Sequence, residues 1–168
     1  MEQAKSSHEN IKVNHDSRPV LPYDLIRIPV KHLADIWPYT LPLVERGLTA
    51  NPNMTIDDLL EGLSDESIQL WIVLSKAEFA KARRQLRAVF FTSIERDRTE
   101  WVLSLYGLGG ERPREWVMAC HEEMHKFAKA EDCKRVRMCG RPAWQRILPG
   151  YQVTGKRQGH LVYERAVE

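Results

Sequence analysis

Two histidines one helical turn apart are the residues best suited to chemistry. The run His121-Glu122-Glu123-Met124-His125 lies where the spacing of apolar residues predicts a helix. In zinc hydrolases, an H-E-x-x-H run binds the metal through both imidazoles and uses the glutamate as general base. The helical phase puts His121 at the edge of the apolar stripe and His125 nearer the polar face. No third ligand stands at a recognised spacing. We therefore interpret the run as a surface helix without a metal, and keep a zinc-dependent hydrolase as an alternative.

A glycine-rich loop is the second candidate for chemistry. Residues 107–113 read Gly-Leu-Gly-Gly-Glu-Arg-Pro and join a predicted strand (100–106) to a predicted helix (115–133). Glycines let backbone N–H groups approach an anion, and the N-terminal end of a helix favours negative charge. Arg112 and Arg114 add cations there. This pattern is typical of phosphate sites, but it also occurs in loops that only turn the chain.

The cysteines indicate the cellular setting rather than a nucleophile. Cys120, Cys133 and Cys139 form no C-x-x-C pair, and no pattern places a histidine side chain against the thiol of Cys120 or Cys139. Core thiols are therefore favoured over acyl-carrying nucleophiles, and a reduced, cytoplasmic location is expected. Residues 1–14 lack the apolar core of a signal peptide, and no apolar run approaches the length of a membrane span.

The composition is that of a soluble globular protein. Hydrophobic residues make up 43% and charged residues 29%, and the net charge of +2 gives no reason to expect a nucleic-acid partner. The length of 168 residues suits one domain, which we place at residues 23–168 after a polar, flexible arm at residues 1–22. The basic residues 76–87 predict a solvated helical insert or an extended hairpin.

The elements that position these residues alternate along the chain. Strands are predicted at 24–30, 68–74, 88–94, 100–106 and 134–139, with a final pair at 151–154 and 160–163. Helices are predicted at 31–48, interrupted by Pro38 and Pro42, and at 55–63, 115–133 and 143–148. This order calls for a mixed sheet covered by helices.

One stretch carries a family resemblance. Residues 128–150, AKAEDCKRVRMCGRPAWQRILPG, run from a helix end with a cysteine through a short strand and Gly140-Arg141 to a helix bearing Trp144. With the element order and the strand–loop–helix unit, they resemble the GNAT N-acyltransferase superfamily. More narrowly, they are similar to GNAT-like proteins of tailed bacteriophages and their hosts. The resemblance covers residues 24–167.

The resemblance implies an α/β (α+β) fold, a GNAT-like twisted mixed sheet flanked by helices, whose fourth and fifth strands part. It implies acetyl-CoA as co-substrate and direct transfer of the acyl group to an amine, with an acid or water-held base and backbone N–H groups that stabilise the oxyanion. The acceptor amine is unidentified, and a protein partner or homodimer is possible. The residues that this implies for acetyl-CoA binding are Leu105, Tyr106, Gly107, Gly109, Gly110 and Arg112.

The chain also departs from the family pattern. Ser104 stands where the family's glycine motif has Gln or Arg, and the loop carries Pro113. Trp144 stands where active members often have a tyrosine that acts as general acid. Tyr151 is nearby but follows a Pro-Gly break. No catalytic residue is therefore assigned. An acyl-CoA-dependent N-acyltransferase is the leading hypothesis, with a catalytically degenerate GNAT-fold phage binding or structural protein as the first alternative and the zinc hydrolase as the second.

Overall fold

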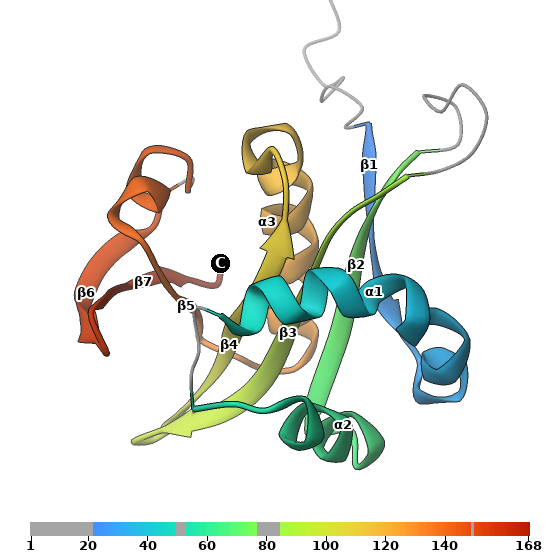
Figure 1. The fold of residues 1–168 in the computed structure, drawn as a ribbon. Coiled ribbons are helices and arrows are strands. Elements are labelled where there is room, and N and C mark those ends of the chain that lie inside the picture. Colours follow the sequence, from blue (N-terminus) through green and yellow to red (C-terminus); the bar gives the residue numbers. More distant parts are fainter. Residues whose placement is uncertain (1–21, 50–52, 77–84, 149) are drawn as a thin grey trace, which may run out of the picture.

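A computed structural model describes residues 22–49, 53–76, 85–148 and 150–168. Seven strands form one sheet in the order β1-β2-β3-β4-β5-β7-β6 (Figure 1). Their bounds are Tyr23–Ile28 (β1), Ile68–Ser75 (β2), Leu86–Asp97 (β3), Glu100–Gly110 (β4), Arg135–Gly140 (β5), Gln152–Arg157 (β6) and His160–Ala166 (β7). The β4–β5 pair is parallel and the other pairs are antiparallel. The predicted mixed sheet is confirmed.

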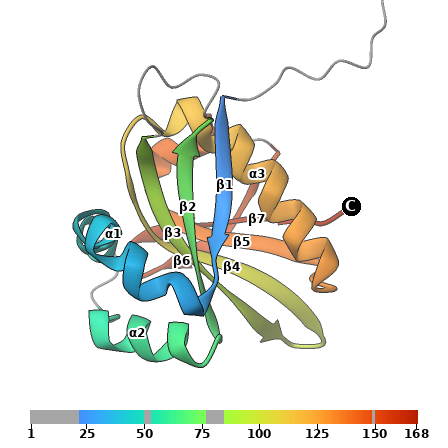
Figure 2. The ribbon, with the colours of Figure 1, turned by 90° about the vertical axis from the view of Figure 1, so that its right-hand side faces the viewer.

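Helices cover both faces of the sheet. The helices α1 (Leu33–Leu48), preceded by the short 3-10 helix η1 (Val30–His32), and α2 (Ile56–Ser64) lie on one face, and α3 (Pro113–Ala130) lies on the other (Figure 2). A five-residue 3-10 helix, η3 (Pro142–Arg146), replaces the longer helix predicted at 143–148. In the described part of the chain, no helix combines the length and the apolar character needed to cross a membrane. The predicted arm at 1–22 and most of the basic stretch 76–87 lie outside the described residues.

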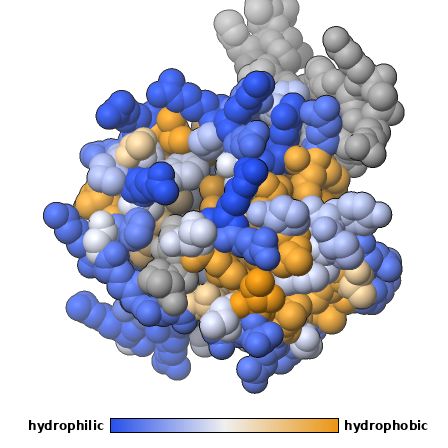
Figure 3. All heavy atoms as spheres, viewed as in Figure 1, coloured by the Kyte–Doolittle hydropathy of each residue, from blue (hydrophilic) through white to orange (hydrophobic). Residues whose placement is uncertain are grey.

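Each face of the sheet has its own apolar core. Neighbouring side chains of a strand point to opposite faces, so Phe90 packs with Trp116 of α3 whereas Phe91 packs with Val44 of α1. Both phenylalanines are buried. The outer surface on the α1 and α2 side is mostly hydrophilic, with hydrophobic residues gathered over these two helices (Figure 3). The alternation thus separates an α3 side from an α1/α2 side of every strand.

The helix α1 is continuous, so the prediction that its prolines interrupt it was wrong. Pro38 and Pro42 both lie inside α1. Each proline removes one backbone hydrogen bond from the helix. The buried face of α1, which includes Val44 and Gly47, packs on the sheet and compensates for this loss.

The strand β4 is longer than predicted, and two glycines explain why. Residues 107–110 are the end of β4 and not a loop, and Gly109 and Gly110 pair with Val89 and Ala88 of β3. A Cβ atom on Gly109 would collide with the carbonyl oxygen of Leu43 in α1, and one on Gly47 would collide with the carbonyl oxygen of Gly107. The backbones of α1 and β4 therefore touch, as only glycine allows.

This contact predicts that Gly109→Ala destabilises the fold. Because the new methyl group meets backbone and not a flexible side chain, we expect the free energy of unfolding to fall by about 3 kcal/mol, measured by urea denaturation. Gly155→Ala is the control, since no atom lies within 4 Å of a Cβ at that position. Equal stability of the two variants would contradict the proposed backbone contact.

Candidate active site

The candidate site begins where β4 and β5 part. Their parallel register runs from Val102–Arg135 to Leu105–Met138 and then stops. Beyond it, β4 continues to Gly110 beside β3, and β5 continues to Gly140 beside β7. Backbone N–H and C=O groups that lose a neighbouring strand need another partner. The parting of two central strands is therefore a natural place for a ligand with amide groups.

A β-bulge lies next to this opening. Val89 pairs with Gly109 and Phe91 pairs with Tyr106, so two residues of β4 stand opposite the single residue Phe90. Gly107 adopts a φ of +64°, in the left-handed region that glycine enters without strain. The bulge bends β4 just after its last pair with β5. It accounts for the change of direction that separates the strands.

Polar side chains gather on the α1/α2 side of the strands at this point. Alternation places Ser93 and Glu95 of β3, Ser104 and Tyr106 of β4, and Arg137 and Cys139 of β5 on this side. The Ser93 hydroxyl donates to Glu95 Oε1 at 3.0 Å. Burial raises the pKa of the Tyr106 phenol to about 12, an effect that hydrogen bonding with Ser93 partly offsets. Tyr106 therefore keeps its proton at neutral pH.

Ser104 is a buried hydroxyl at the centre of this group. The residue is 8% exposed, and its Oγ has no hydrogen-bond partner among the described residues. It pairs in register with Ser93 on one side and with Arg137 on the other. A buried hydroxyl without a partner costs free energy, so it marks a position where a ligand could supply the missing bond.

The structure places the six predicted acetyl-CoA residues along one segment but in different surroundings. Leu105 ends the parallel register, and Tyr106 packs on the α1/α2 core. Gly107 and Gly109 lie against α1, and a Cβ on Gly110 would meet Ala88 and the Arg87 carbonyl oxygen. Arg112 is exposed and caps α3 with a left-handed φ of 51°.

The N-terminal end of α3 carries both acidic and basic side chains. Pro113 occupies the first turn, as the missing N–H of proline allows. Glu111 pairs with Arg46 at 3.1 Å, and Glu115 pairs with Arg112 at 3.5 Å. The Tyr23 hydroxyl also donates to Glu115 at 2.7 Å. The carboxylates at this helix end are thus compensated by neighbours, and Arg114 is exposed beside them.

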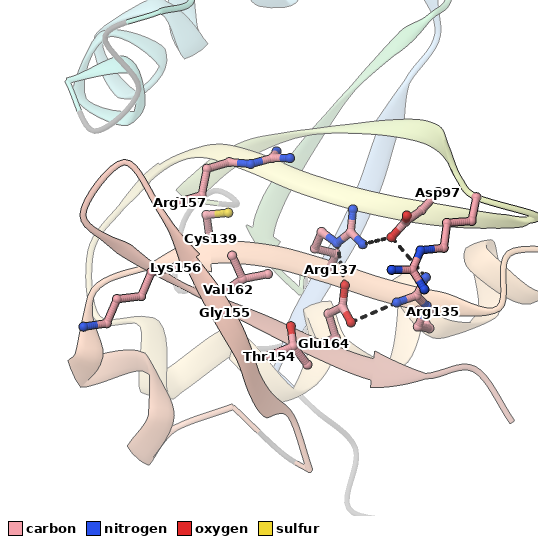
Figure 4. A pocket seen from close by; sticks show the side chains of 11 residues that line it. Asp97, Arg135, Arg137, Cys139, Thr154, Gly155, Lys156, Arg157, Val162 and Glu164 are labelled. Carbon is pink, nitrogen blue, oxygen red and sulfur yellow. Dashed lines mark hydrogen bonds and ion pairs between the residues drawn. The ribbon is translucent and has the colours of Figure 1, made fainter.

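A cavity of about 490 Å³ opens over the strands β5, β6 and β7 (Figure 4). It is lined by residues from the end of β3, the β3–β4 turn, β5, β6 and β7: Asp97, Arg98, Arg135, Arg137, Cys139, Thr154, Gly155, Lys156, Arg157, Val162 and Glu164. Cys139 is the first β5 residue past the last pair with β4. The cavity therefore reaches the opening between β4 and β5.

Two arginines and two carboxylates form a network in this cavity. Arg135 contacts Glu164 at 3.0 Å and Asp97 at 3.2 Å. Arg137 contacts Glu164 at 2.6 Å and also pairs with Asp97. Hydrogen bonding to Arg137, and to Arg135 in addition, lowers the pKa of Asp97. Glu100, at the start of β4, lies 3.2 Å from Arg135 and takes part in the same network.

The two histidines of the H-E-x-x-H run do not lie on an open surface, which corrects the surface-helix interpretation. Their ring centroids are 4.4 Å apart, and both rings meet the edge or face of Tyr151. His125 Nε2 lies 3.3 Å from the Tyr151 hydroxyl oxygen. Among the described residues, no group of three or more His, Cys, Asp or Glu side chains could hold a metal ion. The histidines connect α3 to the segment before β6.

Burial changes the ionisation of both rings. It lowers the pKa of His125 to about 4, with smaller contributions in the same direction from His121 and Arg165. It also lowers the pKa of His121, assisted by Arg165. Both imidazoles are therefore neutral at pH 7.

The structure resembles solved acetyltransferases, although no protein-family model and no curated protein matches the sequence. A ribosomal-protein-S5-alanine acetyltransferase from Vibrio fischeri superposes with a TM-score of 0.59 at 14% identity, covering 90% of this chain and 97% of that one. An N-acyl amino acid synthase from uncultured soil microbes gives 0.57 at 6% identity, covering 86% and 90%. A GNAT-family acetyltransferase from Listeria monocytogenes gives 0.52 at 10% identity, covering 87% and 95%. The chain has the GNAT fold.

Within this GNAT fold, the sequence analysis missed Ser93, Glu95 and Arg137. The strand prediction ended at residue 94, whereas β3 continues to Asp97. Extending the alternation of Phe91 and Ser93 by two residues would have placed Glu95 on the same face. The position of Arg137 beside Ser104 depends on the parallel pairing of two strands separated by a helix, so no local signal could reveal it.

The histidine cluster predicts a loss of stability in mild acid. In the unfolded chain, histidines bind protons with their ordinary pKa of about 6.5, whereas in the folded chain His121 and His125 become protonated only at a lower pH. The free energy of unfolding should therefore keep its full value above pH 6.5 and decrease as the pH falls toward about 4. Urea denaturation at neutral and mildly acidic pH measures this difference.

His121→Asn/His125→Asn should flatten this dependence. His160→Asn, which changes a histidine on the β6–β7 hairpin, is the matched control and should leave it unchanged. An unaltered slope in the double variant would show that the acid sensitivity arises elsewhere.

Proposed function

We propose that the chain is an acyl-CoA-dependent N-acyltransferase that transfers an acetyl group to an amine. The observation that carries this proposal is the parting of β4 and β5 after Leu105 and Met138, beside a bulge, in a GNAT fold. The names of the similar structures describe acetyl or acyl transfer. The similarity of residues 128–150 to tailed-phage proteins supports a phage-type GNAT protein. A cytoplasmic location and a protein partner or homodimer remain predictions from the sequence.

Acetyl-CoA would bind along the end of β4 and at the N-terminal end of α3. We assign its binding to Leu105, Tyr106, Gly107, Gly109, Gly110 and Arg112. The backbone beyond Leu105 has no partner strand on the β5 side and suits the amide groups of a pantetheine arm. The positive end of an 18-residue helix, with Arg112 and Arg114, suits the diphosphate. Because Glu111 and Glu115 are already paired, their charges oppose this binding less than free carboxylates would.

Three side chains on the α1/α2 side would assist transfer. Acyl-CoA supplies a thioester, whose C–S bond breaks as the amine nitrogen forms a bond to the carbonyl carbon. Glu95, oriented by Ser93, accepts the proton that the amine loses. The Tyr106 hydroxyl, protonated at neutral pH, donates a hydrogen bond to the negative charge that develops, and the departing sulfur takes its proton from solvent. Ser104 offers its unpartnered hydroxyl to the acceptor.

Calorimetric titration of acetyl-CoA tests the binding step. We expect a Kd on the order of 10 μM for the native protein. Arg112→Asn/Arg114→Gln should weaken binding by about tenfold because two cations are lost, and asparagine tolerates the left-handed backbone at position 112. Lys129→Gln/Lys134→Gln removes two exposed cations beyond the first turns of α3 and should bind like the native protein. A folded native protein that does not bind acetyl-CoA would refute the proposal and favour a degenerate GNAT-fold binding protein.

Glu95→Gln tests the chemical step. Removing the base should lower turnover by about 100-fold while acetyl-CoA affinity stays unchanged. Release of free thiol, followed with a panel of amines, measures the turnover. Glu61→Gln, which removes an exposed carboxylate on α2, is the comparison and should leave turnover unchanged. Full activity of the Glu95 variant would remove this residue from the mechanism.

A further inference from the structure

The cavity beside the opening has more cations than carboxylates. Its lining includes five basic side chains and two acidic ones (Figure 4). The basic residues are Arg98, Arg135, Arg137, Lys156 and Arg157, and the acidic ones are Asp97 and Glu164. Both acidic residues contact both Arg135 and Arg137. The carboxylates are therefore already engaged, and neither can hold an ammonium group without giving up an arginine.

The remaining cations of the cavity lining come from two separate parts of the chain, the β3–β4 turn and the end of β6. Arg98 is in the β3–β4 turn, and Arg157 ends β6. Burial raises the pKa of the Cys139 thiol, and the nearby Arg157 guanidinium partly offsets this effect. Arg98, Lys156 and Arg157 are exposed, and none of them makes an ion pair within the described ranges of the chain. Figure 4 shows Arg157 beside Cys139, at the end of β5 that borders the opening. The positive charge thus extends to the place where transfer is proposed.

Positive charge of this kind selects among amines. A simple amine is an ammonium ion at neutral pH, and a cation-rich cavity repels it. An amine that also carries a negative group is attracted, since that group pairs with the free cations. Once bound, its ammonium group has a lowered pKa because cations surround it, so the nucleophilic neutral form becomes more populated. The same charges would therefore favour both binding and reactivity.

We infer that this cavity binds the acceptor and that the acceptor is a small anionic amine, with a carboxylate or phosphate group besides the amine. The volume of about 490 Å³ lies in the range of small-molecule sites. Arg157 holds the anionic group near Cys139, and the amine faces Ser104 and Glu95 across the opening. This inference rests on the proposed function for the role of the amine, whereas the selectivity for anions rests on the cavity alone.

Matched pairs of amines test the inference in the absence of acetyl-CoA. 4-Aminobutyrate and butylamine differ by a carboxylate, and phosphoethanolamine and ethanolamine differ by a phosphate. Titration calorimetry should show the anionic member of at least one pair binding about tenfold more tightly, with the preference weakened by added salt. The pair that shows the larger preference identifies the anionic group.

Arg98→Asn/Arg157→Gln should abolish this preference. Asparagine accommodates the positive φ of residue 98, so the turn is kept. Lys129→Gln/Lys134→Gln removes the same number of exposed cations elsewhere and should keep the preference. Equal binding within both pairs would overturn the inference, as would binding of an acidic peptide by a protein that ignores all four small amines.

The two proposals can fail separately. Acetyl-CoA binding without any preference for anionic amines would overturn the anionic acceptor and leave the transferase intact. A preference for anionic amines without acetyl-CoA binding would establish an anion site and overturn the transferase.

Discussion

The contact between the backbones of α1 and β4 is the constraint on which the site depends. Gly47 in the helix and Gly109 in the strand have no Cβ, and a side chain at either position would collide with the opposing backbone. The helix can therefore lie directly on the end of β4 and cover β3 and β4. In the described part of the chain, no helix covers the α1/α2 face of β5, β6 and β7 (Figures 1 and 2). One close contact thus defines both the covered core and the open cavity.

The same strand end also explains how β4 leaves β5. The bulge at Gly107 adds a residue to β4, and the strand turns toward β3 and α1 after its last pair with β5. Gly109 permits the helix contact, and Gly107, two residues earlier, permits the bulge. Their role in the described structure is to bring backbones together. Any role with a ligand would use the N–H and C=O groups that the parted strands expose, rather than the space that a missing side chain leaves.

Charge is distributed unevenly over the open face. Asp97 and Glu164 come from β3 and β7 and meet Arg135 and Arg137 of β5, so three strands are joined by one network. This network neutralises the two central arginines and leaves the cations at the rim. The stability of the sheet here and the selectivity of the cavity therefore have a common origin, since the carboxylates that join the strands are unavailable to a cationic ligand.

Local patterns in the sequence by themselves determined most of the elements and the fold class. Short apolar stretches predicted the strands around Trp71 and Phe90. The three- and four-residue spacing from Trp116 to Ala128 predicted α3, because this period follows from helix geometry alone. The tertiary structure decided the rest. It placed Gly107–Gly110 in a strand under α1, joined Arg137 to Asp97 and Glu164, and packed the half-buried His121 and His125 against Tyr151. Each of these arrangements depends on which distant segments of the chain meet. Packing and long-range charge pairing decide this, and a local sequence pattern carries no information about it.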